Sequence, residues 1–385
     1  MNKKEVLEIR KQFTPENCTI TRICGCYVDH EKEKKMEMKK AFLSMPEEEA
    51  FKYFDIFRHT LSGTVGKNLM TMEFPLDQEL EGGAQELLLR LRDTKLTDDL
   101  LLEEFYDKVI ENYEFAENYY IILIHAAYDV PGKSSDNMEM FDASDTVYEH
   151  IMCSICPVKL DKASLCYNAE KNNIEDRERS WIVQAPDAGF LFPAFNDRNT
   201  DLHSMLYYTR NPEVLQPALM EEVFGCQTPL SAKGQKETFQ ELVTETLGNA
   251  CDYETVVSIH ENLNEIIEEK KDQPEPPTLT KPEVKNLLAI SGAPEEVLDH
   301  FEEQFDATAG NKTEFLATNL TSTKALEVKT PDVIVKVSPE KAALLETRVI
   351  NGRSYLLIQI DDQVEVNGVP IRPVTFSEPD SESEE

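Results

Sequence analysis

Two long apolar runs stand out in the pattern of hydrophobic and polar residues along the chain. They are Tyr119–Tyr128 and Tyr148–Val158, and both are rich in the β-branched and aromatic side chains that favour strands. The residues between them, 131–144, are rich in turn formers. We therefore expect two strands here, and we expect them to be the structural centre of the protein.

The residues before these strands follow a mainly helical pattern, with apolar positions three or four apart. The expected helices are Asn2–Phe13, 46–61, Ala84–Arg92 and Leu100–Tyr113. A strand is expected at Cys18–Val28, a charged connection at 30–40, and a short strand or loop at Asn68–Phe74. Further strands of one largely antiparallel sheet are expected at Ser164–Asn168, Trp181–Val183, Phe190–Phe195 and Leu202–Thr209.

The pattern changes after residue 211, first to helical periodicity and then to short strands. Three helices are expected within 212–271, at Pro212–Phe224, Ala232–Leu247 and Tyr253–Lys271. Residues 272–281 are Pro-rich and predict a semi-rigid linker. Two short helices follow at Lys281–Ser291 and Pro294–Asp306, and then a strand at Val333–Val337.

The C-terminal part carries the strongest turn signals of the chain. Asn351-Gly352 and Asn367-Gly368 each lie between apolar runs, a pattern typical of tight hairpins in a β-meander. We expect a mixed domain at 1–211, a helical segment at 212–271, a small α+β domain at 282–376 and a disordered acidic tail at 377–385. The predicted class is α+β: a helical N-terminal part packed on a mostly antiparallel sheet, a helical middle and a small C-terminal domain with a β-meander.

Charge narrows the partners that this chain can bind. The 385 residues include 73 acids and 39 bases, a net charge of −34, and only five of the acids lie in the last nine residues. An acidic body repels phosphate backbones, so non-specific nucleic-acid binding by the whole surface is not expected. The N-terminus is charged throughout and the longest apolar run is too short to span a bilayer. We expect a cytoplasmic protein with no membrane contact and with reduced cysteines.

Cysteines are the first candidates for a metal site. Those that could assemble are Cys18, Cys24, Cys26, Cys153, Cys156 and Cys166, with Cys24, Cys26, Cys153 and Cys156 the closest pairs. A zinc site needs four ligands from tight turns, whereas Cys153 and Cys156, three apart in a strand, point to opposite faces. Buried thiols in a strand covered on both faces are therefore the expected role, with a metal site or a reactive thiol as alternatives.

The segment 187–203 holds the densest polar residues near the presumed sheet. Its candidate acid, base or metal-binding side chains are Asp187, Asp197, Arg198, Asp201 and His203. Turn chemistry explains Asn196-Asp197 and Asn199 equally well, and Arg198 can pair with an acid. His125, within an apolar strand, is expected to be a core histidine. The glycines of 62–68 have the wrong spacing for a phosphate loop and predict the end of a helix.

Four segments resemble an uncharacterised bacterial family, found mainly in anaerobic Firmicutes and catalogued as a domain of unknown function. They are MNKKEVLEIRKQFTPENCTITRICGCYVD, AFLSMPEEEAFKYFDIFRHTLSGTVGKNL, DVPGKSSDNMEMFDASDTVYEHIMCSICPV and GFLFPAFNDRNTDLHSMLYYT. The resemblance extends over nearly the whole chain and implies no activity. The order of elements also resembles that of NdpA-type nucleoid-associated proteins, through YYIILIHAAY, EHIMCSICPV, LSAKGQKETFQELV and the terminal strands. That likeness implies a similar fold and a chromosome-linked role.

The sequence contains none of the common catalytic or nucleotide-binding motifs, and we expect no cofactor. The favoured hypothesis is a non-enzymatic cytoplasmic binding or scaffolding protein, with nucleoid association as one form of that role. Its macromolecular partner is unidentified, with a protein or a nucleoid component as the candidates. The alternative is a hydrolase or metal-dependent enzyme that uses the 187–203 segment. A homo-oligomeric structural protein is the third hypothesis.

Overall fold

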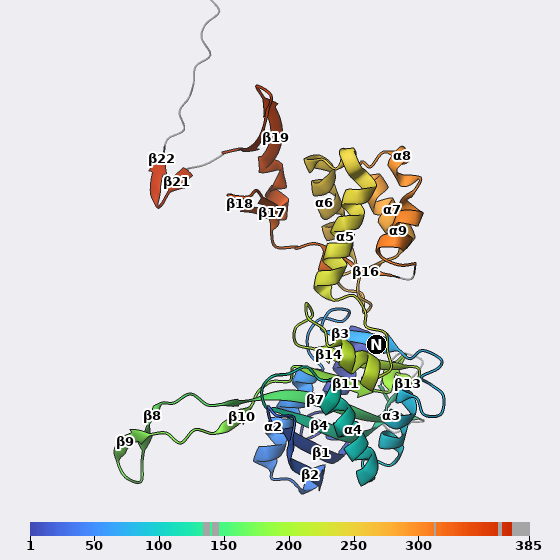
Figure 1. The fold of residues 1–385 in the computed structure, drawn as a ribbon, viewed down its shortest axis with the longest axis vertical. Coiled ribbons are helices and arrows are strands. Elements are labelled where there is room, and N and C mark those ends of the chain that lie inside the picture. The colour runs from blue at the N-terminus through green and yellow to red at the C-terminus, as the bar shows by residue number, and fades with distance from the viewer. Residues whose placement is uncertain (134–138, 141–145, 312, 361–363, 372–385) are drawn as a thin grey trace, which may run out of the picture. The chain divides into compact units, whose positions relative to one another are not determined.

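The computed structural model describes residues 1–133, 139–140, 146–311, 313–360 and 364–371 (Figure 1). The chain forms two compact units. The first contains Met1–Phe239 and Glu269–Thr278, and the second contains Gln240–Glu268 and the residues from Leu279 onward. The predicted boundaries at 211, 271 and 281 stay predictions, and the tail at 377–385 lies outside the described residues.

The first unit is built on one antiparallel sheet in the order β2-β1-β4-β7-β11-β14-β3, with β10 paired to β7 beside this path. Its strands are β1 Ile20–Val28, β2 Lys34–Ala41, β3 Leu69–Glu73, β4 Tyr119–Val130, β7 Thr146–Leu160, β10 Trp181–Val183, β11 Ala188–Phe192 and β14 Ser204–Thr209. The largely antiparallel sheet expected from the sequence is confirmed, and with it the α+β class.

The two strands that the apolar runs predict, β4 and β7, lie at the centre of this sheet. They pair continuously from Tyr119 opposite Pro157 to Val130 opposite Thr146. Alternate residues face two separate cores, so that Cys153 lies on one face of β7 and Cys156 on the other. The prediction that the Cys-x-x-Cys strand is buried on both faces is therefore correct.

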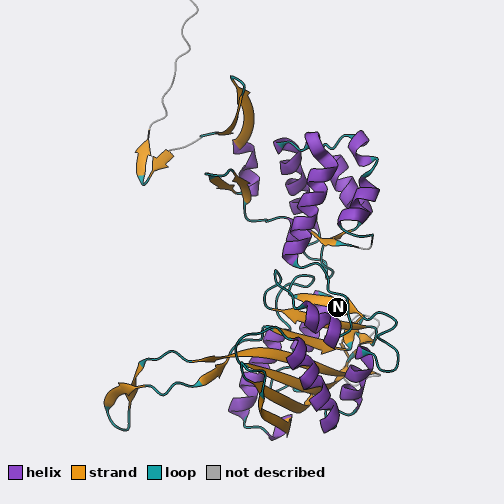
Figure 2. Cartoon of the chain, viewed as in Figure 1, coloured by secondary structure: helices purple, strands orange, loops and turns teal. Residues whose placement is uncertain are grey.

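Four helices cover the two faces of the sheet (Figure 2). They are α1 Lys3–Arg10, α2 Glu47–Thr60, α3 Ala84–Asp93 and α4 Asp99–Asn112. The apolar sides of α3 and α4 share one core with Ile121 and Cys153, while α1 and α2 share the other with Ile122 and Cys156. Polar residues cap the N-termini of two of these helices. Asn2 forms a capping box with Glu5 at α1, and the Asp98 side chain accepts hydrogen bonds from backbone amides in the first turn of α4.

Four segments of this unit differ from the sequence prediction. The strand expected at Phe190–Phe195 is divided into β11 of the main sheet and β12 Ala194–Asn196, which pairs with β13 Asn199–Asp201. Residues 34–41 form the edge strand β2, with Lys39 opposite Cys24 of β1, although their charge suggested a connection. Charged side chains suit an edge strand because they keep it from pairing with other chains. The strand expected at 164–168 is β8 Leu165–Asn168, which pairs with β9 Asn173–Asp176 outside the main sheet. The helix expected at 212–224 is reduced to a short π-helical turn, Leu219–Val223.

Shorter elements complete the unit. They are the pairs β5 Gly132–Lys133 with β6 Glu139–Met140 and β12 Ala194–Asn196 with β13 Asn199–Asp201, and the 3₁₀ turn Phe42–Ser44. Helix α5 Ala232–Leu247 begins in this unit and ends in the second.

The second unit combines helices with separate hairpins. Its helices are α6 Tyr253–Glu269, α7 Lys281–Ile290, α8 Glu295–Leu298, α9 Phe301–Thr308 and α10 Ala317–Leu320, with 3₁₀ turns at Gly248–Ala250 and Pro339–Leu344. Strand β15 Thr278–Leu279 pairs with β16 Phe315–Leu316. The hairpins are β17 Leu326–Lys329 with β18 Ile334–Val337, β19 Leu345–Ile350 with β20 Arg353–Ile358, and β21 Val364–Val366 with β22 Val369–Ile371.

Both Asn-Gly turns form as predicted. Asn351 and Gly352 have φ angles of 51° and 76°, and Asn367 and Gly368 have φ angles of 50° and 81°. Positive φ at both central residues is the geometry that a tight two-residue hairpin requires. The strands of the expected meander therefore pair two by two within the described residues.

Candidate functional site

The polar side chains of the 187–203 segment are occupied by contacts that hold the first unit together. Asp187 accepts a hydrogen bond from the Tyr113 hydroxyl at 3.0 Å. Asp197 and Arg198 form the two-residue turn between β12 and β13, with φ angles of 50° and 56°. Turn chemistry thus accounts for Asp197, as the sequence allowed.

Arg198 and His203 bind acids from distant parts of the chain, and Asp201 binds an amide of the same hairpin. The Arg198 guanidinium binds Glu8 of α1 through Nη2 at 2.8 Å and Nε at 3.0 Å. Asp201 accepts from the Asn196 amide at 2.6 Å, and His203 Nδ1 lies 2.6 Å from the Glu79 carboxylate. The Glu79 partner raises the pKa of His203. The hairpin brings 197–203 together, whereas Asp187 lies at the start of β11, bound to Tyr113 at the end of α4.

The four central cysteines are buried thiols in the sheet. Cys24, Cys26 and Cys153 face the core under α3 and α4, and Cys156 faces the core under α1 and α2. Burial raises the pKa of Cys24 to about 11 and that of Cys26 to about 12, which keeps both thiols protonated near neutral pH. This environment fits the packing role expected from the sequence.

Among the described residues, the acidic group Asp29, Glu31 and Glu33 brings its carboxylates close enough to share one ion. This group lies in the turn between β1 and β2. Asp29 accepts the backbone amides of Glu31 and Glu33, both at 3.0 Å, and binds Lys35 at 3.0 Å. Turn geometry and the lysine therefore account for the cluster.

Two histidines lie inside the sheet. His125 is fully buried, with Nδ1 2.7 Å from the Thr21 hydroxyl, as expected for a core histidine. His150, which the sequence analysis did not single out, is also fully buried and stacks on Tyr148 at 4.5 Å between ring centroids. Burial lowers the pKa of His125 to about 4 and that of His150 to about 3, so both rings are neutral at pH 7.

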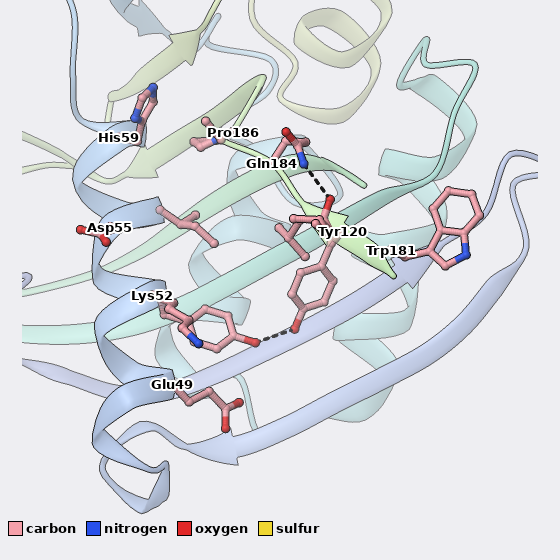
Figure 3. A pocket seen from close by; sticks show the side chains of 13 residues that line it. Glu49, Lys52, Asp55, His59, Tyr120, Trp181, Gln184 and Pro186 are labelled. Atoms are coloured by element: carbon pink, nitrogen blue, oxygen red, sulfur yellow. Dashed lines mark hydrogen bonds between the residues drawn. The ribbon is translucent and has the colours of Figure 1, made fainter. Parts of the chain in front are cut away.

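A cavity of the first unit lies between α2 and residues 181–186, and we call it the α2–β10 groove (Figure 3). Its volume is about 630 Å³. One wall is α2, with Glu49, Lys52, Tyr53, Asp55, Ile56 and His59, and the opposite wall is Trp181, Ile182, Val183, Gln184, Ala185 and Pro186. Tyr120 of β4 lies between the walls, and its hydroxyl is 3.3 Å from that of Tyr53.

The chemistry of the groove is that of a binding surface with an apolar centre and a polar rim. Burial raises the pKa of Tyr53, so the Tyr53–Tyr120 pair consists of neutral phenols. The ionisable rim comes from α2, where Asp55 is bound to Arg58 of the same helix. Trp181, the only tryptophan of the chain, is 55% exposed at the opposite wall. Large aromatic side chains in such positions often anchor a partner.

The wall at 181–186 also has a free strand edge. The backbone amide of Gln184 donates to the Pro157 carbonyl at 2.8 Å, and the backbone amide of Asp161 donates to the Ser180 carbonyl at 2.9 Å. Backbone groups alternate in an antiparallel ladder, so those of Ile182 face β7 while those of Trp181 and Val183 face away from it. Among the described residues, β7 is the only strand that pairs with β10.

Sequence reasoning placed Trp181–Val183 in a strand, but it did not predict the groove. The available signal was a lone Trp-Ile-Val triplet between the charged residues 175–179 and the turn-forming residues 184–187. That pattern marks a short apolar strand, whereas its position opposite α2 follows from tertiary packing.

A family described as a domain of unknown function (DUF4317) matches residues 1–369. The chain belongs to this DUF4317 family. The family resemblance expected from the sequence is therefore confirmed, and the match includes the α2–β10 groove and most of the second unit.

No curated protein matches the chain. Within the described part of the chain, none of the helices combines the length and the apolar composition that crossing a membrane requires.

Proposed function

We propose that this DUF4317 protein is a non-enzymatic cytoplasmic binding or scaffolding protein, and that it takes up an extended segment of a protein partner at the α2–β10 groove. The observation that carries the proposal is the free edge of β10 beside an apolar groove. An extended peptide can pair its backbone with such an edge, while its alternate side chains enter the adjacent pocket. Backbone pairing gives affinity, and the pocket gives selectivity.

The apolar residues of the groove supply the binding energy in this proposal. Trp181 and Val183 lie on the same side of β10, and each is more than two-fifths exposed. Burial of apolar surface stabilises a complex by about 25 cal/mol per Å², before the cost of ordering the partner is subtracted. A partner that covers these side chains therefore gains more than one that contacts the charged rim alone.

The distribution of bases favours a protein partner over direct contact with DNA. The densest basic run, 32–40, lies on and beside β2, where three of its lysines are bound by acids. Lys34 lies 2.6 Å from Asp107, and Lys39 lies 2.8 Å from Asp99 of α4. A lysine that is neutralised in this way has less charge to offer to phosphates. We propose that any association with the nucleoid is made through a protein component.

A retention experiment tests the proposal. Tagged full-length protein and its Trp181→Asp variant are incubated with a lysate of cells that express the protein, and the retained proteins are compared by mass spectrometry. We expect a defined set of proteins to be lost with Trp181→Asp, because the carboxylate prevents apolar burial at the groove. The matched control is Leu100→Asp, which introduces the same charge at an exposed leucine of α4, away from the groove.

Gel shifts over a salt series test the proposal that the protein does not bind DNA directly. We expect no shift of duplex DNA by the purified protein, even at low salt, because counterion release requires free cations on the protein. A salt-dependent shift would show direct DNA binding, and identical retention by the wild type and both variants would contradict a binding role for the groove.

A further inference from the structure

An arm of twenty residues, 161–180, connects β7 to β10. Within it, β8 pairs with β9, from Leu165 opposite Asp176 to Asn168 opposite Asn173 (Figures 1 and 2). Because residues opposite each other share a face and alternate residues share a face, Leu165, Tyr167 and Ile174 lie on the same side of the arm. Their side chains are 74%, 61% and 58% exposed.

Such an arm needs a surface to pack on. An isolated two-stranded hairpin is marginally stable in water, and three large apolar side chains on one face add the cost of their hydration. The arm contains five acids and four bases, a net charge of −1, in a chain of net charge −34. It is therefore a segment that can approach the acidic body of this protein with little electrostatic repulsion.

We propose that the occupant of the α2–β10 groove is the arm of a second copy of this chain, in a two-fold dimer held by antiparallel pairing of β10 with the β10 of the partner. The inference rests on the proposed binding function of the groove and names its partner. The outward backbone groups of β10 belong to Trp181 and Val183, so β10 can pair with a second copy of itself. When the two-fold axis passes through Ile182, Trp181 of each copy lies opposite Val183 of the other copy. Both carry outward backbone groups, so they form hydrogen-bonded pairs.

The antiparallel direction of this pairing places the arm of each copy beside the groove of the other copy. The arm precedes β10 in the chain, and residues 184–186, which line the groove, follow it. In an antiparallel pair, the residues before one strand run beside the residues after the other. Each copy's arm therefore passes along residues 184–186 of the partner, beside α2, and the two-fold axis makes the exchange reciprocal.

The charges at this crossing are nearly balanced. Arg177 and Arg179 lie just before β10, at the base of the arm, where Arg177 pairs with Asp161 at 2.6 Å and Arg179 donates to the Asp161 carbonyl at 2.8 Å. The α2 wall of the groove carries Glu49 and Asp55 beside Lys52, and Asp55 is bound to Arg58. The arm and this wall therefore bring few uncompensated charges together, which favours this approach over other contacts between two acidic molecules.

Sedimentation of the purified full-length chain tests the dimer. We expect a species of twice 44.0 kDa at concentrations from about 1 to about 100 µM. Val183→Pro removes an outward amide without removing a bond to β7, and it should give the monomer. Val183→Thr keeps the amide and the β-branched shape and should remain dimeric. A wild-type monomer throughout this range, or a folded Val183→Pro dimer, overturns the inference.

A disulfide test reports the register even if Val183→Pro fails to fold. The axis brings the two Ile182 Cα atoms to about 4.5 Å, within the range that a disulfide bridges. Ile182→Cys should therefore cross-link the dimer under mild oxidation. Trp181→Cys should cross-link far less, because its two copies are about 7–8 Å apart or more. Equal cross-linking of both variants, or none above the wild-type background, contradicts β10 pairing.

The two proposals can fail separately. A monomeric chain whose lysate partners depend on Trp181 leaves the binding function in place and removes the second copy as occupant. If Ile182→Cys cross-links the dimer and no protein in the lysate depends on Trp181 for retention, the dimer is supported and the binding role of the groove is limited to self-association.

Discussion

His125 and His150 show how single residues set the conditions under which this protein is stable. Both rings are fully buried in the sheet, and burial is the main cause of their lowered pKa values. Glu149 opposes the shift at His125, while Arg92 and Lys95 add to it. The unfolded chain, with ordinary histidine pKa values near 6.5, takes up protons that the folded chain does not bind.

Stability should therefore fall as the pH drops below about 6.5, by roughly 1.4 kcal/mol per pH unit for each histidine, until the pH nears their lowered pKa values. His150→Phe keeps the ring that stacks on Tyr148 and should remove its share of this slope. The measurement is urea unfolding between pH 7 and pH 5. His203→Gln is the control, because Glu79 raises the pKa of His203 and its protonation favours the folded state. A His150→Phe slope equal to that of the wild type would contradict the account.

At this scale, prediction from sequence succeeded where the geometry was local. Cys153 and Cys156 lie on opposite faces because a strand alternates, and Asp197 adopts a turn because its neighbours are turn formers. The partner of Arg198 could not be predicted, because Glu8 lies 190 positions away in the sequence. Only the folded sheet brings α1 beside the β12–β13 turn.

Among the elements, β2 shows why a charged sequence can still form a strand. Its backbone pairs with β1 on one side, and its lysines project where the sheet ends. Hydrophobic periodicity gave only a weak signal here, because the alternating pair Met36 and Met38 is surrounded by charged residues. The charges identify the edge after the fold is known.

Removing two of these charges should expose that edge to other chains. We expect Lys35→Val/Lys40→Val to aggregate faster than the wild type on mild heating, because valine favours strands and the charge that resists pairing is lost. Light scattering over time measures this. Lys35→Gln/Lys40→Gln loses the same charge without the apolar gain and should aggregate more slowly than the valine variant. Equal rates for the two would assign the effect to net charge alone.

For the whole molecule, the net charge of −34 is the main electrostatic feature. Acids outnumber bases along the body as well as in the last nine residues, so the folded chain repels itself. The excess of acids and the α+β class could both be predicted from the sequence. The division into two compact units has no local signal, because helix α5 spans the two units without a break in its pattern.

Salt should therefore stabilise this protein. Raising NaCl from about 20 to about 200 mM shortens the screening length and weakens repulsion among the acids, so the thermal midpoint should rise at pH 7. A gain of about 1 kcal/mol corresponds to a shift of about 2–4 °C in a domain of this size. Scanning calorimetry of wild type and Val183→Pro separates screening within the chain from strengthened dimers. A falling midpoint in both would refute the electrostatic account.

The pairing of Leu160 with Trp181 makes the arm between them separable from the fold. The two ends of the twenty-residue excursion already lie side by side in the ladder, at the spacing that a short hairpin turn closes. The sheet can therefore lose, lengthen or exchange this excursion without a change in its own strand order. Selection, or a protein engineer, can alter what the arm recognises while leaving the scaffold that carries it untouched.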